Sequence, residues 1–278
     1  MLSFKKLEKN DFECINKYLL LDTTRSCEKT GGALMMWRDF YSIKWTIFDE
    51  TLIIRYDNEA TPSYLLPIGK NVKGAIEALG NVTYIGVCEE NLSYFSKQTT
   101  EIIPYRDNYD YIYSAEALRT FKGKSLHSKK NHLNRFKATY SYEFILDGDK
   151  NALIEFFRLI DEKQPHYDET GVAELEETID MVENRELFRL HTGEIRVDGK
   201  IVGASVGAQI GDTLYVHIEK ADREYTGSYQ AIVAEFASAF PSAEFINRED
   251  DLGEEGLRKS KLSYKPLYLL EKYIVIPH

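Results

Sequence analysis

Apolar residues in the second half of the chain follow first a helical and then a strand period. From Asp149, which stands where a helix N-cap belongs, large apolar residues recur at helical spacing up to Ile160, and a second such stretch covers 174–187. Two-residue turns at Asp198-Gly199 and Gly211-Asp212 then separate β-rich runs, which predicts a meander of three strands. The elements expected next are a helix after Gly227, a strand at 244–247, a helix at about 254–262 and a last strand at 268–276.

The first half shows a shorter version of the same order. Residues 43–56 contain two β-rich runs on either side of Asp49-Glu50, which is typical of a hairpin. A short β-rich run, a helical stretch and another β-rich run follow, at 64–68, 71–79 and 82–87. Strands that meander and then alternate with helices are typical of a mixed sheet covered by helices. The sequence therefore predicts an α/β (α+β) fold with an internal structural duplication into residues 1–125 and 126–278, each with a mixed, mostly antiparallel sheet flanked by helices.

Charge and composition argue against several classes of protein. The 278 residues carry a formal net charge of −10, which disfavours a general binder of nucleic acids or anionic membranes. The three cysteines, Cys14, Cys27 and Cys88, include no CxxC pair, so we expect neither a disulfide framework nor a zinc cluster, and we expect a reducing compartment. Because no signal peptide and no apolar run of about 18 residues is evident, the sequence predicts a cytoplasmic protein without integral membrane association.

A basic segment at 117–142 contains no acidic side chain, although the chain as a whole is acidic. Such a segment suits contact with the phosphates of a nucleotide, a coenzyme or a tRNA backbone. The alternative is a solvated helix face whose lysines pair with surrounding acids. The candidates for donor binding in this segment are Lys124, Lys129, Lys130 and Arg135.

The turn ahead of the helix that follows Gly227 is a second candidate for donor binding. A helix that starts after a glycine turn offers N–H groups and a positive dipole end to an anion, which makes Gly227 and Ser228 candidates. Arg223 precedes the same turn and joins them. The alternative for Ser228 is the role of a plain N-cap.

Polar residues follow the predicted strand at 244–247, and ligands in open α/β sheets bind beyond the carboxyl ends of strands. The candidates for substrate binding here are Asn247, Arg248, Arg258 and Lys261. The candidates for proton transfer are Asp250 and Asp251. The alternative is an ordinary cluster of ion pairs, which has the same composition.

Alternation over 213–219 places His217 and Glu219 on one face of the predicted central strand, where either could accept a proton from an attacking amine. A buried, hydrogen-bonded histidine is the alternative. Tyr215 lies on the same predicted face, and Tyr167 lies between two predicted helices; both are candidates for substrate binding. The sequence has no P-loop, HExxH, GxSxG or GxGxxG motif, so we expect no metal site and no dinucleotide site.

Two runs of sequence carry a resemblance to a known family. The runs GKSLHSKKNHLNRF at 123–136 and FINREDDLGEEGLRKSKLSYKP at 245–266, with the order of elements, resemble a group of bacterial proteins. This group is the phosphatidylglycerol lysyltransferase C-terminal-domain-like family of unknown function, related to the FemABX peptidyltransferases and to lysylphosphatidylglycerol synthetase catalytic domains. The resemblance covers nearly the whole chain and implies two tandem GNAT-like (acyl-CoA N-acyltransferase) domains.

The resemblance also implies acyl or aminoacyl transfer, with coenzyme A or aminoacyl-tRNA as the donor and a small-molecule or peptide amine as the acceptor. The lysyltransferases carry membrane helices ahead of the catalytic part, and their absence from this sequence speaks against a lipid acceptor. Ordinary acetyltransferases hold the coenzyme A pyrophosphate with a Gln/Arg-x-x-Gly-x-Gly/Ala loop. The matching stretch starts at Arg223, and Thr226 replaces its first glycine, which weakens the case for acetyl-CoA.

Three functions therefore remain open. The first is that of an acyl- or aminoacyltransferase whose donor and acceptor the sequence does not name. The second is acetyl-CoA-dependent N-acetylation of a small molecule. The third is that of a non-catalytic module with the same fold, which binds RNA or a protein through the basic residues of 119–137.

Overall fold

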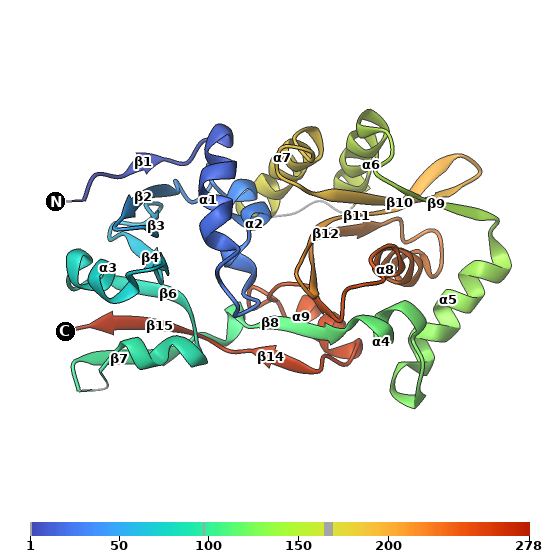
Figure 1. The fold of residues 1–278 in the computed structure, drawn as a ribbon. Helices are drawn as coiled ribbons and strands as arrows, with labels where there is room; N and C mark the ends of the chain where they lie inside the picture. The colour runs from blue at the N-terminus through green and yellow to red at the C-terminus, as the bar shows by residue number, and fades with distance from the viewer. Residues whose placement is uncertain (1, 97, 164–168) are drawn as a thin grey trace. The chain divides into compact units, whose positions relative to one another are not determined.

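The computed structural model describes residues 2–96, 98–163 and 169–278 (Figure 1). The chain forms two compact units. The first contains the residues up to Asp110 together with Asp250–Glu254 and Leu269–His278, and the second contains Tyr111–Glu249 and Glu255–Tyr268. The fold contains two mixed sheets, each flanked by helices, which confirms the predicted fold class of two α/β halves.

The sheet of the first unit has the strand order β1-β2-β3-β4-β6-β15-β7, and β5 pairs with β3. Its strands are β1 (Lys5–Lys6), β2 (Lys44–Phe48), β3 (Thr51–Tyr56), β4 (Ser63–Leu65), β5 (Ile68–Gly69), β6 (Thr83–Cys88), β7 (Thr100–Pro104) and β15 (Lys272–Pro277). The α-helices of this unit are α1 (Phe12–Leu19), α2 (Gly31–Met36) and α3 (Val72–Leu79). The expected hairpin is the β2–β3 pair, whose turn residues Asp49 and Glu50 both have positive φ, as a tight hairpin turn requires.

The last strand of the chain lies inside the first sheet. β15 pairs with β6 on one side and with β7 on the other. The sequence predicts a single strand at 268–276, but the chain forms two strands there, β14 (Tyr268–Leu270) and β15, with Glu271 between them. The single strand was a wrong expectation because β14 joins the second sheet and β15 the first, a division that the local pattern does not encode.

The sheet of the second unit has the strand order β14-β8-β13-β12-β11-β10-β9. Its further strands are β8 (Asp110–Ser114), β9 (Tyr142–Leu146), β10 (His191–Val197), β11 (Lys200–Ile210), β12 (Thr213–Ala221) and β13 (Phe245–Asn247). Its α-helices are α4 (Ala115–Thr120), α5 (His127–Thr139), α6 (Lys150–Lys163), α7 (Glu169–Glu183), α8 (Ser228–Ala239) and α9 (Glu255–Ser263).

The helix cap and the hairpin turn that the sequence predicts in the second unit are present in the structure. The Asp149 carboxylate accepts a hydrogen bond from the backbone N–H of Ala152 at 2.9 Å, as an N-cap side chain does. Asp198 and Gly199 both have positive φ and join β10 to β11. The apolar face of α8, which includes Ile232 and Phe236, packs against β10, β11 and β12, whereas α6 lies on the other side of the sheet (Figure 1).

Candidate functional site

Strands β12 and β13 pair over three residues and then separate. They run parallel, and the last pair is Tyr215 with Asn247. Beyond that pair β12 continues to Ala221, whereas β13 ends. The residues of β12 after Tyr215 therefore have no partner strand on that side in the described part of the chain. A parallel pair that opens at its carboxyl end is where a ligand site is expected in such sheets.

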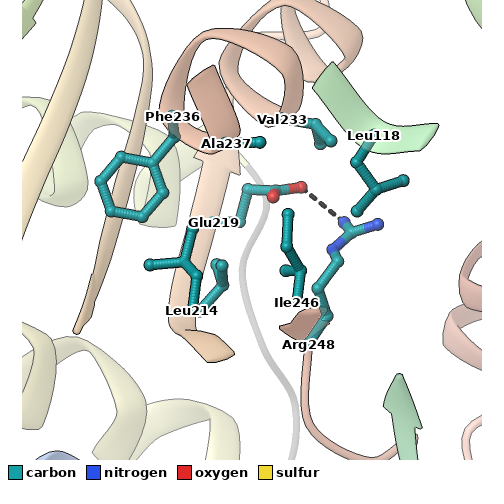
Figure 2. Close-up of a pocket in the computed structure, with 9 residues that line it drawn as sticks. Leu118, Leu214, Glu219, Val233, Phe236, Ala237, Ile246 and Arg248 are labelled. Carbon is teal, nitrogen blue, oxygen red and sulfur yellow. Dashed lines mark hydrogen bonds and ion pairs between the residues drawn. The ribbon is translucent and has the colours of Figure 1, made fainter. Parts of the chain in front are cut away.

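A small cavity lies at this separation (Figure 2). Its volume is about 10 Å³, enough for roughly one water molecule. Helices α4 and α8 contribute apolar side chains above it, and β12, β13 and the residue after β13 contribute the rest. The lining residues with charged side chains are Glu219 and Arg248.

Glu219 and Arg248 form an ion pair between the two separated strands. A guanidinium N–H of Arg248 donates to Glu219 Oε1 at 2.6 Å. The Arg248 side chain is 12% exposed and the Glu219 side chain is 10% exposed. Burial raises the pKa of the Glu219 carboxyl, and the nearby charges of Arg248 and Lys261 offset only part of that effect. Burial disfavours the charged form of Arg248, but Glu219 outweighs this and holds the pKa of Arg248 above its usual range. The site therefore contains a carboxyl group that is more basic than an exposed glutamate.

Aromatic rings and further cations surround Arg248. Its guanidinium carbon lies 4.6 Å from the ring centroid of Tyr264 and 5.7 Å from that of Tyr113. The ammonium group of Lys129, on α5, lies 3.9 Å from the centroid of the same Tyr264 ring. Lys261, on α9, donates to the backbone carbonyl of Arg248 at 2.6 Å. The structure thus brings Lys129 together with Arg248 and Lys261, which the sequence analysis named in two separate segments.

His217 is held by Glu249, which belongs to the polar run after the predicted strand at 244–247 and to which the sequence analysis gave no role. Its Nδ1 lies 2.8 Å from Oε1 of Glu249, and its side chain is fully buried. Its Nε2 is buried and has no hydrogen-bond partner in the described part of the chain. Glu249 follows Asn247 and Arg248 directly, so its position in the same polar run was the signal that could have identified it. Tyr264 was also missed, and it closes the family-like run at 245–266.

A β-bulge at His217 breaks the alternation that the sequence predicts for β12. Val206 pairs with Ile218 and Gly207 with Val216, so His217 is an extra residue in β12. As a result, Glu219 lines the same cavity as Leu214 and Val216. The expectation that Glu219 lies opposite those two apolar residues was wrong, because one inserted residue reverses the faces beyond it.

The turn at Gly227 is packed against helix α5. Gly227 has φ of +94°, and a Cβ atom placed on it would lie 2.4 Å from the backbone oxygen of His132. Ser228 is buried, and its hydroxyl donates to the backbone carbonyl of Asp222 at 2.8 Å. Arg223 lies in the turn between β12 and α8 and is exposed. The contacts of Gly227 and Ser228 are thus with the protein itself, and their role in donor binding stays a prediction.

The remaining candidates occupy different surroundings. Lys124, Lys130 and Arg135 are exposed on or next to α5, whereas Lys129 is half-buried. Tyr215 and Asn247 are buried, and the Asn247 side chain accepts a hydrogen bond from the backbone N–H of Glu249 at 2.7 Å. Arg258 lines an open groove on α9 with a volume of about 420 Å³. Tyr167 lies outside the described residues.

Asp250 and Asp251 belong to the first unit, unlike Glu219 and His217. Asp251 is fully buried and forms an ion pair with Arg106 at 3.0 Å. Its other oxygen accepts a hydrogen bond from the backbone N–H of Gly253 at 3.0 Å. These contacts are those of a residue that stabilises its own loop. The proposed proton transfer by Asp250 or Asp251 stays a prediction.

One group of side chains among the described residues has the spacing of metal ligands, and it lies in the first unit. It consists of Cys27, Glu28 and Asp250. The ammonium group of Lys272, which is fully buried, lies 2.6 Å from Glu28 Oε2 and 3.5 Å from the sulfur of Cys27. A cation is therefore already provided by the chain at this position, and the group does not indicate a metal site.

The chain belongs to the family described as phosphatidylglycerol lysyltransferase, C-terminal, whose model matches residues 22–276. A solved structure of a conserved protein of unknown function from Bacteroides thetaiotaomicron is 32% identical, with a TM-score of 0.89 over the full length of both chains. An uncharacterized protein of Mycoplasmoides gallisepticum is 29% identical over 220 residues, which are 73% of this chain and 68% of that protein.

A more distant solved structure shows the fold. L-PGS from Bacillus licheniformis is 13% identical, with a TM-score of 0.69 over 98% of this chain and 93% of that one. The family and this likeness confirm the resemblance inferred from the two sequence runs. Two mixed sheets with flanking helices are the fold that the chain shares with this structure. In the described ranges, no helix has the length and apolar character that crossing a membrane requires.

Proposed function

We propose that the chain is an acyl- or aminoacyltransferase whose reacting groups meet in the second unit, where β12 and β13 separate. The observation that carries the proposal is the buried Glu219 carboxyl at the cavity between the two strands. Membership of a lysyltransferase family supports the reaction class. The donor is an acyl ester or thioester, such as aminoacyl-tRNA or an acyl-coenzyme A, and the acceptor is a small-molecule or peptide amine.

Glu219 is proposed as the group that accepts the proton of the attacking amine. The amine nitrogen forms a bond to the carbonyl carbon of the donor, and the bond from that carbon to oxygen or sulfur breaks. The proton released by the amine passes to Glu219 and from there to the leaving group. A carboxyl group whose pKa is raised by burial is a stronger base than an exposed one, so its environment suits this role.

The backbone of β12 supplies the second element of the proposal. The bulge at His217 and the loss of β13 as a partner after Tyr215 leave N–H groups of this segment outside the parallel ladder. Such groups could polarise the donor carbonyl and stabilise the oxyanion of the transition state. His217 and Glu249 hold the bulge in place through their 2.8 Å contact.

The test uses tRNA charged with labelled amino acids and, separately, labelled acetyl-coenzyme A, each with a set of primary amines. We expect label to move from a donor to an amine in the presence of the whole chain. Glu219→Gln should lower turnover about 10²–10⁴-fold when both proteins are assayed at a temperature at which circular dichroism shows them folded. Glu235→Gln is the matched control, because Glu235 pairs with Lys137 at the surface of the same unit and should keep full turnover.

Two results would count against the proposal. If no donor transferred its label, the proposed reaction would be wrong. If Glu219→Gln turned over as fast as the wild-type chain, Glu219 would not be the proton acceptor. Salt-dependent binding of uncharged tRNA without any turnover would favour the non-catalytic module instead.

A further inference from the structure

Ser205, on β11, carries a hydroxyl group that is buried without a partner. The residue is fully buried, and its Oγ has no hydrogen-bond partner in the described part of the chain. A buried polar group that forms no hydrogen bond destabilises the folded state, so native cores rarely retain one without a function. Alanine would fill the same position in the strand without that cost.

The cross-strand neighbours of Ser205 single out Glu219. In the antiparallel ladder Ser205 pairs with Gly193 on β10 and with Glu219 on β12. Paired residues point to the same face of a sheet, with their Cβ atoms about 4.5–5.5 Å apart. Of the two neighbours, Gly193 has no side chain, whereas Glu219 has a carboxyl group at the end of a flexible stem. The Glu219 carboxyl group is therefore the cross-strand group within reach of the Ser205 hydroxyl.

Helix α8 covers this face of the sheet closely. A Cβ atom placed on Gly193 would lie 2.5 Å from Cδ2 of Phe236, which belongs to α8. A Cβ atom placed on Gly203, two residues before Ser205, would lie 3.4 Å from Cβ of Ile232 on the same helix. The two glycines thus let α8 approach the strands on either side of Ser205. This packing favours a partner from the protein over a water molecule.

The Glu219 carboxylate is turned toward Arg248 in the structure, which accounts for the unused serine. A guanidinium N–H of Arg248 donates to Oε1 of Glu219 at 2.6 Å, and this contact stabilises the ionised carboxylate. Once the carboxylate accepts a proton, its charge is lost and the attraction to Arg248 weakens. The resulting carboxylic acid has an O–H group that needs an acceptor. The lone pairs of Ser205 Oγ supply one.

We propose that Ser205 is a positioning residue that holds Glu219 in its protonated form during transfer. The amine nitrogen gives its proton to a Glu219 oxygen, and the new O–H group donates to Ser205 Oγ while the serine keeps its own proton. The proton then passes from Glu219 to the leaving oxygen or sulfur, and the carboxylate returns to Arg248. This proposal rests on the proposed transferase function, because Ser205 acts only through Glu219.

The charged and titratable groups around Glu219 come from several elements. Arg248, after β13, and Lys261, on α9, both favour the ionised carboxylate. Burial, with a contribution from the charge of Glu219, raises the pKa values of Tyr113 on β8 and Tyr264 after α9, so both rings stay neutral while a carboxyl group titrates. The side chains that α4 and α8 place at the cavity are apolar. A hydrogen bond from the protonated carboxyl group opposes the two cations, because it stabilises the neutral form.

The experiment follows the Glu219 carboxyl carbon by NMR in the whole chain labelled with carbon-13 glutamate, and Glu219→Gln identifies the signal. Ser205→Ala removes the acceptor for the neutral form, so the titration midpoint of this signal should move to lower pH. Ser205→Thr retains a hydroxyl group and should return the midpoint toward that of the wild-type chain. Ser238→Ala is the matched control, because the Ser238 hydroxyl on α8 donates to the backbone carbonyl of Ala234 at 2.7 Å, and it should leave the midpoint unchanged.

The transfer assay gives a second readout of the same variants. Ser205→Ala should lower turnover about 3–10-fold at a pH above the midpoint, which is the effect of one hydrogen bond on the barrier. It should also move the rising limb of the pH profile to lower pH. Ser238→Ala should change neither. A purely structural role of Ser205 would lower stability without moving this limb.

Three results would overturn the proposal. The first is an unchanged midpoint in Ser205→Ala. The second is a midpoint at higher pH, because the hydroxyl group would then donate to the ionised carboxylate instead of accepting from the protonated one. The third is an equal shift in Ser238→Ala. If Ser205→Thr fails to fold, Ser205→Ala still decides, since alanine fits the space of serine.

The titration and the transfer experiment can fail independently. A midpoint that depends on Ser205, without any transfer of label, would keep the contact and remove the proposed reaction. Transfer that depends on Glu219, with a midpoint that does not depend on Ser205, would keep the reaction and remove Ser205 from it.

Discussion

Glu219 carries a charge in surroundings that disfavour it. Its cavity neighbours are largely apolar, and one guanidinium group, that of Arg248, lies within hydrogen-bond distance of it. Because burial outweighs the attraction of Arg248, the pKa of Glu219 lies above its ordinary value of 4.5. The same carboxyl group should therefore impose one pH dependence on stability and another on turnover.

We expect stability to fall as this carboxyl group loses its proton. Since the pKa of Glu219 is higher in the folded chain than in the unfolded one, the folded state holds the proton more tightly. The contribution to stability is fully present below the unfolded value of 4.5 and is lost as pH rises through the raised folded value. Urea unfolding of the wild-type chain and of Glu219→Gln over a pH series measures this, and the difference between them should shift across that window.

The control for this series is Glu235→Gln, whose curve should run parallel to that of the wild-type chain. If the Glu219→Gln difference were independent of pH, the carboxyl group would have an ordinary pKa and would be a weaker base than proposed. Turnover should rise over the same window, because only the ionised carboxylate can accept a proton.

The β-bulge in β12 and the packing of α5 on α8 decide where the site residues lie. One extra residue at His217 turns Glu219 toward the cavity. The close contact between the Gly227 turn and His132 brings α5 against the start of α8, and Lys129 lies one turn earlier on α5. The positions of Glu219 and Lys129 thus depend on two local backbone features.

Gly227→Ala should destabilise the second unit and displace α5. The new Cβ atom would meet the backbone oxygen of His132, and alanine is strained at φ of +94°. Gly123→Ala is a matched control, because Gly123 has φ of +107° and no atoms within 4 Å of its added Cβ, so it bears the backbone strain alone.

We expect Gly123→Ala to cost about 1–2 kcal/mol in unfolding free energy and Gly227→Ala clearly more, as measured by denaturant titration. Equal losses in the two variants would show that the approach of His132 is tolerated and that α5 does not depend on this glycine.

The sequence predicts helices, strands and turns well, but it does not reveal irregularities within strands or contacts between distant residues. The N-cap at Asp149 and the turn at Asp198-Gly199 could be predicted because each acts through its immediate neighbours. The bulge at His217 could not, because an inserted residue is visible only against the partner strand. The contact of Glu249 with His217 was not predicted for a related reason, because it joins residues 32 positions apart.

The first sheet contains strands from both ends of the chain. Residues 269–278 return to the first unit, where β15 lies between β6 and β7. The sequence predicts the duplication of the fold from the order of elements, but it contains no local sign that the last strand crosses back. Such a crossing depends on which strand edges are open, and those are set by the whole fold.

Removal of residues 272–278 should unfold the first unit and leave the second intact. The truncation takes the partner of β6 and β7 away, and with it the buried ammonium group of Lys272, which balances Glu28 and Asp110. Amide hydrogen exchange followed by peptide should show loss of protection in β2, β3 and β6, with β10, β11 and β12 still protected. Removal of His278 alone is the control and should preserve both patterns. Protection retained in β6 after the longer truncation would contradict this expectation.

The interior position of β15 also sets an order of events during translation. Residues 110–270 contain every described strand of the second sheet and leave the ribosome before residues 272–277, so that sheet can be completed first. Until β15 arrives, the facing edges of β6 and β7 lack their partner and are exposed to other chains. Nascent chains stalled just short of Lys272 should accordingly be the form that chaperones retain most strongly.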